Sequence, residues 1–178
     1  MIANIVSVSR VVLTFGVLFV FGKHPRVDIA VIPTIAFIIA LDAVDGSIAR
    51  HRNETSRLGE MLDTLADRVI ENSFWIYFTV LGLLPVWMPV LVLACGFLSD
   101  ALQGLHGYPS SGWRHALTRA RLSRAVSGIT KLLAFSSLAG AKVFRDAELE
   151  TASLWLARLA VCVCLLRGVP FLFRDNNN

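Results

Sequence analysis

Residues 41–67 read LDAVDGSIARHRNETSRLGEMLDTLAD and place four aspartates inside a sequence that is otherwise strongly apolar. Asp42 and Asp45 are three residues apart, and Asp63 and Asp67 are four apart, so each pair projects from one face of a helix. A carboxylate at bilayer depth costs roughly 2.5–3.5 kcal/mol, so four of them require a compensating cation. Clustered carboxylate oxygens are ligands that suit Mg²⁺ and Mn²⁺. The stretch therefore predicts a divalent metal site shared by two helices.

The composition of the chain indicates an integral membrane protein. Hydrophobic residues make up 55% of the 178 residues, which is more than a soluble globular domain needs. Six apolar segments can be drawn, each close to the roughly 20 residues that cross the hydrocarbon. They cover residues 5–22, 29–50, 58–84, 86–105, 125–144 and 152–173. We therefore predict an all-α protein with six transmembrane helices in a single domain, residues 1–178.

Lysine and arginine are unevenly distributed between the two ends of these segments. Eight lie at the end that carries the aspartates, namely Arg50, Arg52, Arg57, Arg114, Arg119, Arg121, Arg124 and Arg174. Four lie at the opposite end, namely Lys23, Arg26, Lys142 and Arg145. Because basic residues accumulate on the cytoplasmic side, both termini and the aspartates are predicted to be cytoplasmic. The loop 51–57 then joins the second and third helices on that side and brings the two aspartate pairs face to face.

Other classes of site find little support in the sequence. A nucleic-acid-binding module would show a basic face on a soluble domain, and none is visible. The basic residues instead flank apolar segments, as anionic lipids or phosphates favour. Cys95, Cys162 and Cys164 are odd in number and lie inside apolar stretches, which argues against a disulfide framework or a zinc site.

Eight positions of the opening stretch match the signature of the CDP-alcohol phosphotransferase family. They are Asp42, Asp45, Gly46, Ala49, Arg50, Gly59, Asp63 and Asp67. With each residue type at about 5–9% usage, such a match occurs by chance in roughly one window in 10¹⁰. The chain thus resembles this family. Because it begins almost directly at Asn4, it resembles in particular the compact bacterial phosphatidylglycerophosphate synthases.

The resemblance implies a function in phospholipid biosynthesis at the bacterial inner membrane. The expected enzyme is a homodimer whose active site faces the cytoplasm. It would transfer a phosphatidyl group from CDP-diacylglycerol to an alcohol and release CMP. Two Mg²⁺ or Mn²⁺ ions would be held by Asp42, Asp45, Asp63 and Asp67, with Asp67 also acting as general base. The CDP-lipid would contact Asn4, Ser7, Gly46, Ala49, Arg50, Ser56 and Gly59.

The acceptor is predicted from basic residues near the fifth apolar segment. Residues 107–124 form the longest polar stretch, whose basic run predicts a surface helix. A lysine one turn inside the membrane is costly unless it meets an anion. Arg114, Arg124 and Lys131 are therefore expected to bind a phosphorylated acceptor, most simply glycerol 3-phosphate. Inositol phosphate, serine and other alcohols stay open, because residues 127–131 match the Gly-Lys-x-Lys-Thr element of the glycerol-phosphate enzymes only loosely.

A membrane cation transporter is the alternative from a different class, since acidic residues on membrane helices also line ion pathways. Such a pathway needs polar residues toward the outer side, yet residues 81–90 contain no charge. Two further acidic residues, Glu71 and Asp100, are expected to pair with arginines.

Overall fold

The computed structural model describes residues 2–52, 57–106, 112–118 and 121–172, and the regular structure in this part is helical. Seven helices occur there: α1 (Ile2–Val20), α2 (Pro25–Arg52), α3 (Arg57–Val80), α4 (Trp87–His106), α5 (Gly112–Thr118), α6 (Arg121–Phe144) and α7 (Ala147–Leu172). The all-α prediction is confirmed. Six long helices occupy the six apolar segments, and α5 lies in the polar connection where a short helix was expected.

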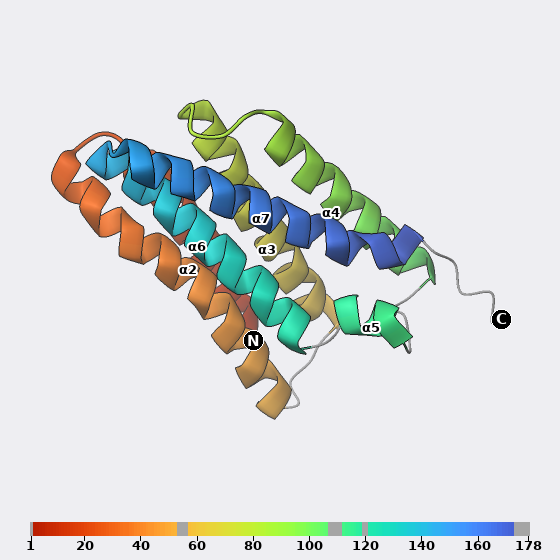
Figure 1. Cartoon of the computed structure of the whole chain (residues 1–178). Helices are drawn as coiled ribbons and strands as arrows, with labels where there is room; N and C mark the ends of the chain where they lie inside the picture. The colour runs from red at the N-terminus through yellow and green to blue at the C-terminus, as the bar shows by residue number, and fades with distance from the viewer. Residues whose placement is uncertain (1, 53–56, 107–111, 119–120, 173–178) are drawn as a thin grey trace.

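The contacts between the six long helices close into a ring in which each packs mainly against two neighbours. Figure 1 shows these helices gathered side by side in one bundle. Around the ring the order is α1, α2, α6, α7, α4, α3 and back to α1. The short helix α5 packs on α7 and α6 near one end of the bundle. Ring order therefore differs from chain order, and α1 is the helix that contacts both α2 and α3.

An aromatic cluster from α3 and α6 fills the middle of the ring. The Phe135 ring centroid lies 5.1 Å from that of Trp75, 5.4 Å from that of Phe74 and 6.0 Å from that of Phe78. All four side chains are almost completely buried. Phe74 and Phe78 lie about two and three helical turns beyond Asp67 along α3. The cluster therefore closes the ring on one side of the aspartates.

Two helix ends differ from the apolar boundaries for local reasons. Gly82 has φ of 78°, and it lets the Gly82 N–H bond to the Thr79 carbonyl and the Leu83 N–H to the Phe78 carbonyl. This pattern ends α3 at Val80, although apolar residues continue. At the start of α7, the Asp146 carboxylate accepts the N–H groups of Glu148 and Leu149. That N-cap allows α7 to begin at Ala147.

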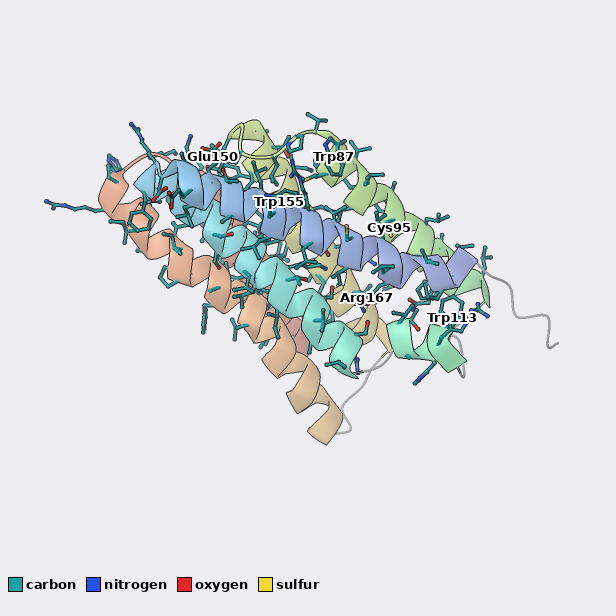
Figure 2. The ribbon with its side chains drawn as sticks, in the orientation of Figure 1. Trp87, Cys95, Trp113, Glu150, Trp155 and Arg167 are labelled. Carbon is teal, nitrogen blue, oxygen red and sulfur yellow. The ribbon has the colours of Figure 1, made fainter. Side chains whose placement is uncertain are left out.

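The outer surface of the bundle carries large apolar side chains. Phe19, Val80, Phe97 and Leu105 are each more than 60% exposed. Trp87 on α4 and Trp155 on α7 are also exposed (Figure 2). Among the described residues, α4 and α7 are long and apolar enough to cross a membrane. The number of spans and the side of the termini stay predictions.

Gly168 permits close packing of α7 against α4, which yields a stability prediction. A Cβ placed on Gly168 would lie 2.5 Å from Cys95 Sγ and 3.1 Å from Ser99 Oγ. Gly168→Ala should therefore lower the free energy of unfolding by about 1–3 kcal/mol through overpacking. Thermal unfolding in detergent micelles measures this loss.

Two further variants make the Gly168 test specific. Adding Cys95→Ala removes the clashing sulfur and should restore part of the lost stability. Gly104→Ala on α4 is the matched control, because its added Cβ meets nothing within 4 Å. Equal stability of the Gly168 and Gly104 variants would contradict the packing argument.

Candidate active site

The two aspartates of α3 are held by side chains from α1. Ser7 Oγ donates a hydrogen bond of 2.9 Å to Asp63 Oδ1, and Arg10 Nη1 lies 3.2 Å from Asp67 Oδ1. Ser7 and Arg10 are three residues apart on α1, while the aspartates are four apart on α3. Residues at these spacings are neighbours on a helix surface. The two carboxylates therefore share the side of α3 that faces α1.

The signature residues of α2 lie outside the part of the chain whose side chains are described. Six predicted site residues lie where only the course of the helix is described, namely Asp42, Asp45, Gly46, Ala49 and Arg50 in α2 and Asn4 in α1. Ser56 lies outside the described residues altogether. Gly59 lies one helical turn before Asp63. The face-to-face arrangement of the two aspartate pairs stays a prediction.

The structure describes the side chains of two of the four predicted metal ligands. Among the side chains that the structure describes, no group of three or more His, Cys, Asp or Glu could hold a metal ion. Of the four predicted ligands, only Asp63 and Asp67 fall in this part. They supply carboxylate oxygens about one helical turn apart, a donor type that fits Mg²⁺ or Mn²⁺.

A polar cavity of about 450 Å³ lies inside the ring, with Asp67 on its wall. All seven helices contribute lining residues. The basic ones are Arg10, Arg68, Arg124, Lys131 and Arg167, and the acidic ones are Asp67, Glu71 and Asp100. Among the lining residues that the structure describes, five basic against three acidic side chains leave a surplus of two positive charges. A cavity of this size and charge suits a small, doubly negative ligand.

Ion pairs between helices organise the cavity wall. Arg68 binds Asp100 through two hydrogen bonds, Nε to Oδ2 at 2.8 Å and Nη2 to Oδ1 at 2.7 Å. Lys131 Nζ donates to Glu71 Oε2 at 2.7 Å, and Arg68 Nη1 lies 4.0 Å from the same oxygen. The expected pairing of Asp100 with an arginine is confirmed. Glu71 lies closer to a lysine than to an arginine, because α6 brings Lys131 across the ring.

The three predicted acceptor residues occupy different places. Arg124 and Lys131 both line the cavity. Arg114, on α5, does not belong to this lining, and its Nε donates to the Pro170 carbonyl at 3.1 Å. Arg124 and Lys131 thus share a cavity with Asp67, whereas Arg114 links α5 to α7.

Arg167 also lines the cavity, although it is not among the site residues that the sequence predicts. It lies on α7 near α5 (Figure 2), and its Nη2 donates to the Thr118 carbonyl at 3.5 Å. Its Nε is buried and has no hydrogen-bond partner within the described part of the chain. A sequence signal existed, because an arginine inside an apolar helix is costly unless it serves an anion or a polar cavity.

The comparison with known proteins identifies the family. Residues 1–164 match the family described as CDP-alcohol phosphatidyltransferase, so the chain belongs to that family. This confirms the resemblance that the eight signature positions indicated.

Individual relatives match only in part. The chain is 27% identical over 116 residues to the inner membrane protein YnbA of Escherichia coli K12, covering 60% of this chain and 57% of that one. It is 37% identical over 71 residues to a CMP-forming cardiolipin synthase of Streptomyces coelicolor, covering 38% and 33%. It is 28% identical over 139 residues to the CDP-diacylglycerol–glycerol-3-phosphate 3-phosphatidyltransferase of Bacillus subtilis, covering 77% and 56%. The matched region thus spans between a third and just over half of the length of these relatives.

Proposed function

We propose that this protein transfers a phosphatidyl group from CDP-diacylglycerol to glycerol 3-phosphate and releases CMP. Family membership supports the reaction type. The printed name of the Bacillus subtilis relative supports the acceptor. The Streptomyces relative has a different printed activity, so the family alone does not determine the acceptor.

The observation that carries the proposal is the cavity that joins Asp67 to Arg124 and Lys131. A phosphate monoester brings roughly −1.5 to −2 charge, which matches the surplus of two positive charges among the described lining residues. Arg167 adds a guanidinium whose Nε lacks a hydrogen-bond partner in the described structure. A neutral acceptor such as serine would leave this charge uncompensated.

The positions of the described side chains support the following chemistry. The acceptor hydroxyl oxygen bonds to the phosphatidyl phosphorus, the bond from that phosphorus to the CMP oxygen breaks, and CMP leaves with the electron pair. Asp67 takes the hydroxyl proton as general base, since its side chain is 40% exposed and borders the cavity. Arg124 and Lys131 hold the acceptor phosphate, so that its hydroxyl points toward Asp67.

The CDP-lipid is assigned to the signature end of α1, α2 and α3. Two Mg²⁺ or Mn²⁺ ions, held by Asp42, Asp45, Asp63 and Asp67, would neutralise the diphosphate. Asn4, Ser7, Gly46, Ala49, Arg50, Ser56 and Gly59 would contact the CDP-lipid. Of these, Ser7 also donates to Asp63, so it would link the lipid site to a metal ligand.

The proposed cellular setting is a bacterial inner membrane. The six long helices would span it, with both termini and the active site on the cytoplasmic side. A homodimer with closed two-fold symmetry is proposed as the assembled form. Exposed apolar side chains on the outer surface support the membrane setting.

The test of function is CMP release from purified protein supplied with CDP-diacylglycerol. The panel contains glycerol 3-phosphate, inositol phosphate, serine, phosphatidylglycerol and no acceptor. We expect CMP only with glycerol 3-phosphate. Release with another member would reassign the acceptor, and no release with any member would refute the reaction.

Neutralising Arg124 or Lys131 should weaken acceptor binding. Each charge-assisted hydrogen bond is worth about 1.5–3 kcal/mol, so Arg124→Gln or Lys131→Gln should raise the KM for glycerol 3-phosphate about tenfold or more. The KM for CDP-diacylglycerol should change little, because other residues hold that lipid. Steady-state kinetics with each substrate varied in turn measures both constants.

Two features make this kinetic test selective. Lys142→Gln is the matched control, because Lys142 is an exposed lysine at the far end of the same helix. Arg124→Gln is the cleaner variant, since Lys131→Gln also leaves Glu71 without its closest cation. Wild-type acceptor kinetics in both variants would contradict a phosphorylated acceptor.

A further inference from the structure

We propose that Arg10 is a positioning residue that holds the Asp67 carboxylate and ties together the two helices bearing the signature aspartates. The inference rests on the proposed function, in which Asp67 is both a metal ligand and the general base. Arg10 is not one of the eight signature positions, and its contacts alone point to this role.

Arg10 bridges α2 and α3 from its place on α1. Its Nη1 lies 3.2 Å from Asp67 Oδ1 on α3, and its Nε donates to the Ile38 carbonyl on α2 at 3.3 Å. Ile38 precedes Asp42 by four residues, about one helical turn. One planar guanidinium thus fixes the backbone beside the first α2 aspartate and the side chain of the last α3 aspartate. A lysine ammonium is a single point charge and cannot reproduce both directions.

The burial of Arg10 makes this contact energetically important. The residue is only 2% exposed, whereas the Asp67 side chain is 40% exposed. A buried guanidinium is costly without an anion, and removing one partner of such a pair is strongly destabilising. Arg10 therefore keeps Asp67 turned toward α1, with the carboxylate still at the cavity wall.

Arg10 and a bound divalent ion would compensate the same negative charge. Without metal, the positive charge on Arg10 offsets part of the repulsion among the carboxylates. With metal bound, the ion supplies most of that compensation. The contribution of Arg10 to stability should therefore be larger in the metal-free protein, which a merely structural arginine would not show.

The experiment compares full-length wild type with Arg10→Gln and Arg10→Lys in detergent micelles. Melting temperatures are measured in excess chelator and in millimolar Mn²⁺, and kcat and KM are measured with saturating metal. Arg158→Gln is the control, because Arg158 is an exposed arginine whose guanidinium lies 4.6 Å from the Trp155 ring centroid.

We expect Arg10→Gln to lower the melting temperature, relative to wild type, by at least twice as many degrees in chelator as in Mn²⁺. Arg158→Gln should change the melting temperature by the same amount in both. Misplacing a reacting group by about 1 Å can cost 10²-fold, so kcat should fall by about tenfold to a hundredfold. The KM for CDP-diacylglycerol should stay within about threefold of the wild-type value, because the lost interaction stabilises the transition state rather than the bound lipid. Arg10→Lys should recover the chelator stability more than kcat, because it keeps the charge and loses the bridge.

Equal losses of melting temperature in chelator and Mn²⁺, or wild-type kcat in Arg10→Gln, would overturn the proposal. If Arg10→Gln does not fold, Arg10→Lys decides, and near-normal kcat with near-normal stability overturns it as well. Failure of the proposed reaction looks different, because wild type itself would then release no CMP with any acceptor, whereas the melting temperatures in chelator and Mn²⁺ would still test the contact between Arg10 and Asp67.

Discussion

Removing divalent cations should abolish CMP release, to below about 1% of the untreated rate, and adding Mg²⁺ or Mn²⁺ should restore it. Four clustered carboxylates repel one another without a cation, and divalent ions stabilise both the attacking and the leaving oxygens in phosphoryl transfer. Such a loss corresponds to an increase of about 2.7 kcal/mol or more in the activation free energy. The measurement is initial CMP release across a titration of chelator and metal.

The control for this prediction adds the chelator already saturated with Mg²⁺, which separates metal removal from inhibition by the chelator itself. Activity should then equal that of untreated protein. Full activity in excess free chelator would eliminate the two-metal site on Asp42, Asp45, Asp63 and Asp67.

Asp67→Asn should lower kcat by about 10²–10⁴-fold, the usual contribution of general acid–base catalysis. The amide keeps the size of the side chain but cannot take the hydroxyl proton. Binding of CDP-diacylglycerol should stay close to normal, because the other three aspartates and Arg50 remain. Turnover at saturating substrates and direct binding of the CDP-lipid measure the two effects separately.

Asp63→Asn provides the contrast for Asp67→Asn. Asp63 receives a hydrogen bond from Ser7 and does not belong to the cavity lining. Its substitution should raise the metal concentration needed for half-maximal activity as well as lower turnover. Glu148→Gln, an exposed acid in the first turn of α7, is the control. Near-normal turnover in Asp67→Asn would defeat its assignment as the base.

Local sequence was sufficient to predict most helices. The segment predicted at residues 86–105 is α4 (Trp87–His106), because length and apolar composition act within one helix. The deviations have local causes that composition does not report. The α3 helix ends before residue 84 because Gly82 adopts a positive φ, and α7 begins before residue 152 because Asp146 caps it.

The sequence by itself determined the family, through eight spaced signature positions, and the identity of the charged residues that apolar helices carry. Only the tertiary structure decided which charges meet. Lys131 and Glu71 are sixty residues apart and pair because α6 packs across the ring from α3. Arg10 reaches Asp67 and Ile38 because α1 lies against both α2 and α3. Helical periodicity specifies the face of the helix on which a residue lies. Which neighbouring helix that face contacts depends on how the six long helices are ordered around the ring.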